Sequence, residues 1–229
     1  MSYQLTITPA KVSELPSDET LLALANELLQ TTDSWKKGKL YHKTVQTYSR
    51  SKGPNDGAPW HARVSVHAKE DATFDEFWSK LGQNKAENEK EFIDAIKKVT
   101  EVKRISETQT IYTLYYTFPP PVSPRVFTVL QTTYLKEDTP KTGIIVSVPV
   151  DLSEDPELAK LEEKGTKGRY VSVERLLELE DGKTEWRMAT SSTPGGSIPT
   201  FIAESSMAGQ ISADVPHFLH WFHKIRESS

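Results

Sequence analysis

The stretch TPGGSIPTFIAESSMAGQISADVPHFLHWFHKIR, residues 193–226, joins a turn sequence to a long helical pattern, and the rest of the chain is interpreted around it. The segment 194–196, Pro-Gly-Gly, permits a sharp reversal after a strand. Ser197 can cap the helix, which we expect to begin at Ile198. The apolar residues on one face of the helix are Ile198, Phe201, Ile202, Ile211, Val215, Phe218, Phe222 and Ile225. The sequence therefore predicts a final helix anchored at both ends.

The middle of this helix carries side chains that are too small to fill a core. They are Ser205, Ser206, Ala208 and Gly209, and they indicate either close packing or a place where the helix roofs a space. Pro216 lacks a backbone N–H, which inside a helix costs about 3 kcal/mol. We therefore expect one helix that bends or restarts near Pro216.

Length and composition indicate one soluble globular domain over residues 1–229, with 36% hydrophobic and 26% charged residues. The formal net charge of −4 gives no general attraction to phosphate backbones, so nucleic acid is not an expected partner. Basic residues cluster within 36–39 and 97–104. Solvated faces and contact with anionic lipid both explain these clusters.

Cysteine is absent from the sequence, which excludes disulfides, thiolate metal sites and thiol catalysis. The N-terminal residues lack the apolar core of a signal peptide. No run approaches the roughly 20 apolar residues that span a bilayer. We therefore expect a cytoplasmic protein whose membrane contact, if it occurs, is peripheral and transient.

The first half of the chain reads as a helix over 16–35, a hairpin of strands 39–50 and 60–69, and two further helices over 74–81 and 88–99. The second strand alternates, and its apolar set faces inward: Trp60, Ala62, Val64, Val66 and Ala68. The opposite set, His61, Arg63, Ser65 and His67, is predicted to face solvent. Thr73 and Glu76 form a capping box for the helix that follows them.

The second half reads as a run of strands that we expect to form an antiparallel meander before the final helix. Their predicted bounds are 102–106, 109–118, 125–136, 143–150, 168–180 and 183–192. A stiff proline loop occupies 119–124. The segment 151–167 is predicted to be a solvated excursion with a short helix at 156–163.

Standard signatures of catalytic and metal sites are absent from the sequence. His217, His220 and His223 recur every three residues and therefore fan around a helix, which favours a surface or partly buried face over metal binding. Ser205 and Ser206 have no histidine that the sequence places beside them. We expect no catalytic residue, no metal and no cofactor.

Polar residues on apolar strand faces are the most informative remaining signal. Alternation with Val171 and Val173 turns Arg175 inward, and alternation with Phe127 and Val129 turns Gln131 inward. Arg175 is either half of a structural ion pair or a polar anchor on the floor of a ligand cavity. Two further strands have aromatic-rich faces that either pack in the core or line a cavity. Their residues are Tyr112, Leu114, Tyr116, Trp186, Met188 and Thr190.

Three motifs resemble those of the StAR-related lipid-transfer (START) domain, a member of the helix-grip superfamily. They are PPVSPRVF at 120–127, GRYVSVERLLEL at 168–179 and TSSTPGGSIPTFIAE at 190–204. The resemblance runs from about Lys39 to Arg226 and is nearest to a fungal START-like group. Val126, Thr193 and Gln131 differ from the charged residues common in parts of that family, which weakens a claim of sterol specificity and leaves the ligand class open.

The resemblance implies an α+β helix-grip fold, in which a curved antiparallel sheet wraps around the final helix and encloses an apolar tunnel. It further implies non-enzymatic binding and transfer of one hydrophobic ligand: a lipid, a sterol or a polyketide-like molecule. The alternatives are a superfamily cyclase or hydrolase of hydrophobic substrates and an interaction scaffold with a solid core. The predicted ligand-binding residues are Tyr112, Leu114, Tyr116, Phe127, Val129, Gln131, Val173, Arg175, Trp186, Met188, Phe201, Ile202, Ser205 and Met207. The proline loop and the front half of the final helix are expected to lie together as a gate.

Overall fold

The computed structural model describes residues 3–196, 198 and 200–228, without the side chains of residues 200–202. The described strands are β1 (Ala10–Lys11), β2 (Lys36–Tyr41), β3 (Val45–Arg50), β4 (Trp60–His67), β5 (Ile96–Arg104), β6 (Gln109–Tyr116), β7 (Arg125–Lys136), β8 (Thr142–Asp151), β9 (Thr166–Lys167), β10 (Arg169–Glu178) and β11 (Thr184–Thr193). The described helices are η1 (Val12–Glu14), α1 (Asp18–Thr31), η2 (Thr32–Ser34), α2 (Phe74–Leu81), α3 (Lys85–Phe92), α4 (Pro156–Ala159) and α5 (Thr200–Glu227).

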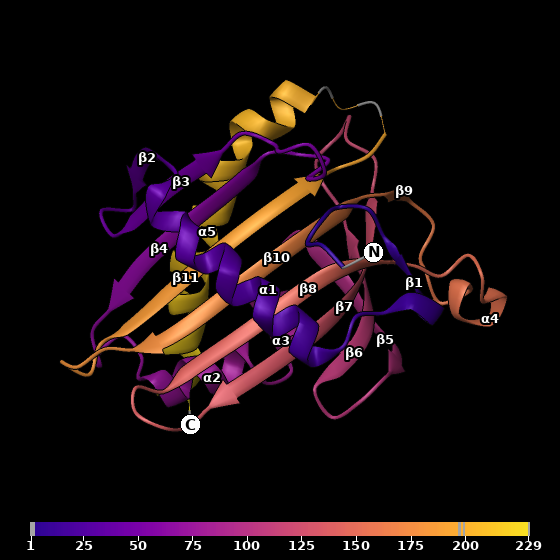
Figure 1. The fold of residues 1–229 in the computed structure, drawn as a ribbon. Coiled ribbons are helices and arrows are strands. Elements are labelled where there is room, and N and C mark those ends of the chain that lie inside the picture. Colours follow the sequence, from indigo (N-terminus) through magenta and orange to yellow (C-terminus); the bar gives the residue numbers. More distant parts are fainter. Residues whose placement is uncertain (1–2, 197, 199, 229) are drawn as a thin grey trace.

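The strands form one 11-stranded curved sheet with the order β2-β3-β4-β11-β10-β8-β7-β6-β5 (Figure 1). Neighbours along this path are antiparallel, while the short strands β1 and β9 pair in parallel with β8 and β7. The antiparallel meander expected for the second half is confirmed, because β5, β6, β7, β8, β10 and β11 pair in that order. The earlier strands extend the sheet at its other end, where β4 pairs with the last strand, β11. The chain then crosses through α2 and α3 to the opposite edge at β5.

Helices cover both faces of the sheet, with α1 across one face and α5 across the other (Figure 1). Under α1 lies a core that contains Leu21, Ala25 and Leu28 of the helix together with alternate strand residues such as Val146 and Val173. Ser17 caps α1 by accepting a hydrogen bond from the backbone N–H of Thr20. Burial of this apolar stripe is what holds α1 on the sheet.

A second core joins α2 and the C-terminal half of α5 to the other face of the sheet. The rings of Phe77 and Phe218 stack with centroids 5.2 Å apart. The predicted capping box of Thr73 and Glu76 is confirmed. The buried face of α5 is confirmed at Ile211, Val215, Phe218 and Phe222.

The ends of the final helix differ from the prediction. The helix α5 begins at Thr200 rather than at Ile198, and Ser197, the predicted cap, lies outside the described residues. Pro216 lies inside α5, which continues through it without a restart.

Two other predicted elements are wrong in their bounds. The strand predicted over 39–50 is a hairpin, β2 and β3, because His42 and Lys43 adopt positive φ angles of 48° and 66° and reverse the chain. The helix predicted over 88–99 ends at Phe92, and Ile96 and Val99 belong to the strand β5. Residue Ile93 already has an extended backbone, and the β-branched residues that follow suit a strand.

The predicted solvent face of β4 is also wrong. Arg63, Ser65 and His67 are buried, whereas Val66 is 45% exposed. The alternation itself is correct, but the face judged to be wet lies beneath α5. Burial lowers the pKa of His67 to about 4, so this imidazole is neutral at physiological pH.

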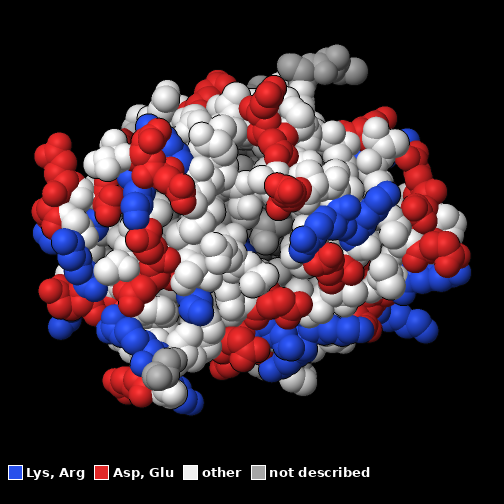
Figure 2. Space-filling model, turned by 90° about the horizontal axis from the view of Figure 1, so that it is seen from below, with Lys and Arg blue, Asp and Glu red and all other residues white. Residues whose placement is uncertain are grey.

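The two basic clusters lie on the two edge strands, β2 and β5. Lys36, Lys37 and Lys39 are exposed, as are Lys97 and Lys103. Lysine on an edge strand hinders pairing with another chain, which accounts for both clusters without a ligand. Acidic and basic side chains intersperse across the face in Figure 2. None of the described helices is long and apolar enough to cross a membrane.

Candidate functional site

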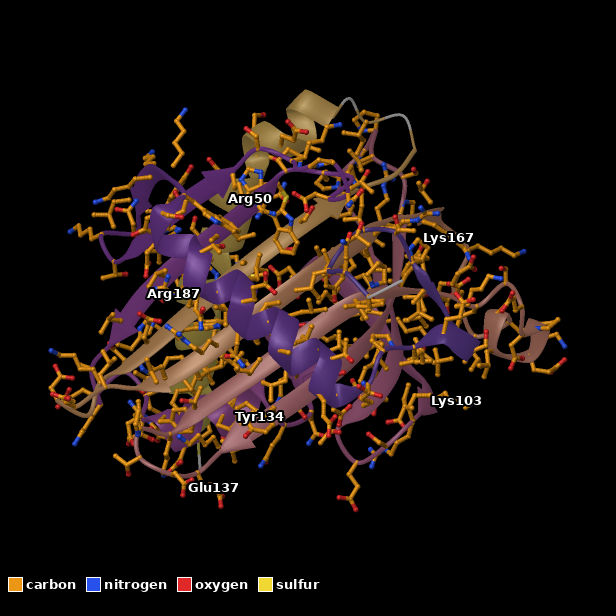
Figure 3. All side chains as sticks on the ribbon, viewed as in Figure 1. Arg50, Lys103, Tyr134, Glu137, Lys167 and Arg187 are labelled. Carbon is orange, nitrogen blue, oxygen red and sulfur yellow. The ribbon has the colours of Figure 1, made fainter. Side chains whose placement is uncertain are left out.

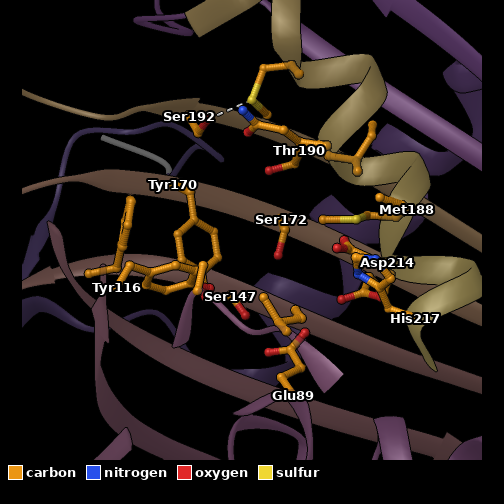
Figure 4. A pocket seen from close by; sticks show the side chains of 18 of the residues that line it. Glu89, Tyr116, Ser147, Tyr170, Ser172, Met188, Thr190, Ser192, Asp214 and His217 are labelled. Atoms are coloured by element: carbon orange, nitrogen blue, oxygen red, sulfur yellow. Dashed lines mark hydrogen bonds between the residues drawn. The ribbon is translucent and has the colours of Figure 1, made fainter. Parts of the chain in front are cut away.

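A cavity of about 410 Å³ lies between α5 and the sheet (Figure 4). The strands β6, β7, β8, β10 and β11 supply its floor, and α3 and the loop after it supply one wall. Its lining residues are Lys85, Glu89, Ile93, Asp94, Ala95, Tyr116, Phe118, Phe127, Ser147, Tyr170, Ser172, Glu174, Met188, Thr190, Ser192, Met207, Gln210, Ile211, Ala213, Asp214 and His217.

One end of the cavity is aromatic. The ring of Phe127 lies 5.2 Å from Tyr116 and 5.6 Å from Tyr170, and Phe118 stacks on Tyr116 at 6.2 Å. Burial raises the pKa of Tyr116 well above its ordinary value, so its hydroxyl stays protonated. These rings form a wall suited to an apolar ligand group.

Hydroxyl groups line the floor along three adjacent strands: Ser147 on β8, Ser172 on β10, and Thr190 and Ser192 on β11. The Thr190 hydroxyl donates to the carbonyl of Val171 at 3.0 Å. Alternation places these hydroxyls on the face beneath α5, opposite the apolar face beneath α1. The floor is therefore more polar than the packed side of the same strands.

A buried ionic cluster occupies one side of the cavity. The Lys85 ammonium lies 2.6 Å from Glu89 and 2.8 Å from Glu174. Burial opposes the charge of Lys85, but the two carboxylates outweigh it and raise the pKa of the lysine. Burial and the charge of Glu174 raise the pKa of Glu89, despite the lysine.

Arg63 extends this cluster from β4. Its Nη2 lies 3.8 Å from Glu174, and its guanidinium lies 4.0 Å from the centre of the Trp186 ring. The Trp186 indole N–H donates to the same carboxylate at 2.9 Å. Burial would raise the pKa of Glu174, but Lys85 and Arg63 together lower it, so this carboxylate is ionised.

Asp214 enters the cavity from α5, close to His217 (Figure 4). Burial is the largest cause that raises its pKa to about 7, and the charges of Glu89 and Glu174 add to it, while Arg63 and Lys85 oppose it. Among the described residues, no lysine, arginine or histidine lies within 4.0 Å of its carboxylate. Asp214 is therefore a half-buried acid without an ion-pair partner in the described part of the chain.

Metal binding has no support in this arrangement. Within residues 3–196, 198 and 200–228, no group of three or more histidine, aspartate or glutamate side chains could hold an ion. His223 instead forms a 2.7 Å hydrogen bond with the carbonyl of Asp71.

The structure brings part of the predicted ligand-binding set together. Tyr116, Phe127, Met188 and Met207 line the cavity. The remaining residues on the same side of their strands pack beside it rather than line it: Tyr112, Leu114, Val129, Gln131 and Trp186.

Three further predicted residues lie away from the cavity. Val173 belongs to the core beneath α1. Arg175 shares that face of β10 and forms a 2.6 Å ion pair with Glu185, which also binds Arg187 on the α1 side of the sheet (Figure 3). Ser205 is exposed on α5. The side chains of Phe201 and Ile202 lie outside the described residues.

The charged lining residues were missed by the sequence analysis. Lys85 and Glu89 are four residues apart in a segment rich in charge, where nothing marks them as buried. Glu174 alternates with Val173 and Arg175, so the prediction that turned Arg175 inward left no reason to place Glu174 in the cavity. A signal for Asp214 did exist, because it precedes Val215 on a helix whose neighbouring positions are buried.

The expected contact between the proline loop and the final helix stays a prediction. The ideal Cβ position at Gly196, just before α5, lies 3.7 Å from Arg125 and 3.1 Å from Thr166. Phe118, which precedes the loop, and Met207 on α5 line the same cavity. A gate built from these parts stays a prediction.

Comparison with known proteins identifies the fold. A family model described as "Protein of unknown function (DUF3074)" matches residues 60–222. The structure of human STARD10 is similar with a TM-score of 0.76 at 12% identity, covering 93% of this chain and 82% of that one. Human StAR-related lipid transfer protein 5 is similar at 0.73 and 15% identity, covering 91% and 97%. No curated protein sequence matches the chain.

A bacterial structure shares the same fold. The StAR-related lipid transfer protein fragment of Xanthomonas axonopodis is similar with a TM-score of 0.63 at 16% identity, covering 82% of this chain and 98% of that one. These likenesses confirm the predicted START-like helix-grip fold.

Proposed function

The chain belongs to the family described as a protein of unknown function (DUF3074), and on the START-like fold we propose that it binds one hydrophobic ligand in the cavity beneath α5. The observation that carries this proposal is a cavity of about 410 Å³ with an aromatic wall, inside the span of roughly 300–1,000 Å³ typical of ligand pockets. Two similar structures are named as StAR-related lipid transfer proteins, and a third, of human StarD13, is named as a lipid transfer and protein localization domain, which supports the proposal by analogy.

Transfer between membranes extends this proposal. A ligand enclosed by α5 exchanges only when the roof opens, so a transient peripheral contact with a membrane is part of the function. We also propose that the protein is cytoplasmic and that residues 1–229 form a single domain. A lipid, a sterol and a polyketide-like molecule fit the cavity as broad classes.

Ligand binding is tested on purified protein by native mass spectrometry and by solvent extraction. We expect a recurrent apolar molecule to leave with the protein and to be taken up again by the extracted protein. A Met188→Trp variant fills the cavity and should abolish uptake, whereas Tyr134→Trp, at an exposed position on the α1 side, should not. No uptake by the wild-type protein across lipid classes would refute the proposal.

Transfer is tested separately by movement of a fluorescent lipid from donor to acceptor vesicles. We expect the protein to accelerate this movement in proportion to its concentration, and Met188→Trp to remove the effect. If the protein takes up ligand but does not accelerate movement of the lipid between vesicles, it binds the ligand without transferring it.

The second candidate is an enzyme that acts on the bound ligand, such as a cyclase or hydrolase. Asp214 favours it, because a carboxyl with a pKa of about 7 inside a cavity can donate or accept a proton at neutral pH. Mass spectrometry of the bound molecule over time tests this candidate. We expect no change in its mass or structure, and conversion that Asp214→Asn abolishes would make the protein an enzyme.

A further inference from the structure

The charges around the cavity do not balance. Lys85 contacts two carboxylates, Glu89 and Glu174, and Glu174 also contacts Arg63. These two cations and two anions form a neutral cluster. Asp214 lines the same cavity and adds a carboxyl group for which the described part of the chain provides no cation within 4.0 Å.

The two cations are unsuited to bind an anionic ligand. Lys85 is buried and both of its carboxylate contacts are shorter than 3 Å. Arg63 lies over Trp186 and is 1% exposed, and it does not line the cavity. An anion in the cavity would meet Asp214 without a cation free to offset the repulsion.

Asp214 and the aromatic wall lie at different places in the cavity. Figure 4 shows Asp214 and His217 entering from α5, away from Tyr116 and Tyr170. A ligand whose apolar body lies against the rings can therefore place a polar end beside Asp214. The hydroxyls of Ser147 and Ser172 lie along the floor between these places.

A half-buried carboxyl that lines a cavity without a cation beside it is costly to ionise, so it either keeps a proton or receives a cation from outside. A ligand ammonium group supplies that cation and forms a charge-assisted hydrogen bond. It also brings the formal charge of Arg63, Lys85, Glu89, Glu174 and Asp214 to zero.

We propose that the cavity selects an apolar molecule with one protonated amino group, which Asp214 binds while the aromatic wall holds the apolar body. This inference rests on the proposed function and names the chemical class of the ligand. His217 lies on the same helix and lines the cavity next to Asp214.

Binding of this class depends on pH. The charged and titratable groups around the cavity that holds Asp214 are Arg63 on β4, Lys85 and Glu89 on α3, Asp94 in the loop after α3, Tyr116 on β6, Tyr170 and Glu174 on β10, and His217 on α5. An alkylamine keeps its proton below pH 9, as a lysine does. The Asp214 carboxyl, with its pKa of about 7, is ionised in only about one molecule in a hundred at pH 5. Affinity for the amine should therefore rise on the order of a hundredfold from pH 5 to pH 8.

The test is calorimetric titration of the extracted, ligand-free protein with probes that share one alkyl chain, used below their micelle concentrations. The probes are dodecylamine, dodecanol, dodecanoate and dodecyltrimethylammonium. We expect dodecylamine to bind most tightly at pH 8 and to lose about a hundredfold in affinity at pH 5. Dodecanol should show little dependence on pH.

Two variants assign the effect to Asp214. Asp214→Asn should lower the affinity for dodecylamine and remove its dependence on pH, while uptake of dodecanol persists. Glu204→Gln removes one charge from an exposed position of the same helix and should change neither.

Three results would overturn the inference. Dodecanol or dodecanoate binding as tightly as dodecylamine at pH 8 would reject the amine class and leave the proposed function standing. Equally tight binding of dodecyltrimethylammonium, which is positively charged but has no N–H group, would show that positive charge alone, without N–H donation, determines binding. Failure of every probe to bind, together with absence of any apolar molecule in extracts, would reject the proposed function as well.

Discussion

Replacement of Asp214 by asparagine tests whether this carboxyl is an unpaired acid, independently of any ligand. Asparagine has nearly the same shape as a protonated aspartate and cannot ionise. Burial raises the pKa of Asp214 in the folded protein to about 7 from an ordinary value of 3.8. The contribution of Asp214 to stability is therefore fully present below pH 3.8 and is lost as the pH rises toward 7.

The size of the effect follows from the pH interval. Between pH 5 and pH 7 the unfolded chain carries the carboxylate, whereas the folded protein still holds the proton. Each pH unit in this interval removes about 1.4 kcal/mol from the free energy of unfolding. The advantage of Asp214→Asn over the wild type should therefore grow by about 3 kcal/mol from pH 5 to pH 8. Relaxation of the cavity and entry of water would make the measured value smaller.

Urea denaturation of ligand-free protein at pH 5 and pH 8 measures this difference. Comparison between the two pH values cancels any direct effect of the amide on packing, and Glu204→Gln serves as the exposed control. An equal difference between variant and wild type at both pH values would refute the assignment, because it would mean that Asp214 ionises normally in the folded protein. Ligand must be removed first, since a bound amine would hold Asp214 ionised.

Three other substitutions probe the remaining parts of the site. Arg175→Met should leave ligand uptake unchanged and cost about 1 kcal/mol in urea denaturation, because its glutamate partner keeps a second arginine; reduced uptake would return Arg175 to the cavity. Lys85→Met should lower the free energy of unfolding by about 3–5 kcal/mol at pH 7 and by less at pH 5, where the carboxylates left without a partner accept protons. The exposed control Lys90→Met should change it little, and equal losses in the two variants would argue against a buried cluster. Joining Phe118→Cys to Met207→Cys with a bifunctional thiol reagent should slow ligand exchange, and unchanged exchange in cross-linked protein would place the entrance elsewhere.

Local sequence patterns predicted the helices and strands well where a single signal, such as alternation, a capping box or helical spacing, determined the structure. The bounds of β7, Arg125–Lys136, match the predicted strand, and Thr73 and Glu76 form the predicted capping box. The four-three spacing of apolar residues on α5 predicted its buried face. The hairpin of β2 and β3 was missed, because a turn made by His42 and Lys43 lacks the glycine or asparagine that usually marks a positive φ.

On β4 and β10 the face of the sheet that borders the cavity was assigned wrongly for a physical reason. Alternation separates two faces, but it does not say which face packs a core and which encloses a space. On β10 the apolar residues Val171 and Val173 pack beneath α1, while Ser172 and Glu174 line the cavity. Placing the apolar set in the cavity therefore put Arg175 there as well. Pairing of β4 with β11, which sequence spacing does not reveal, buried Arg63 and His67 on the same side.

The buried charges also bear on why the cavity exists. An apolar core of the same volume would stabilise the fold at least as well as a buried ion pair, because desolvation offsets most of the attraction between the charges. Lys85, Glu89, Glu174 and Asp214 nevertheless line a space of about 410 Å³ that no described side chain fills. An interaction scaffold with a solid core needs neither feature. In a ligand-binding protein the space receives the ligand, and under the proposal above the carboxyl of Asp214 selects its polar end.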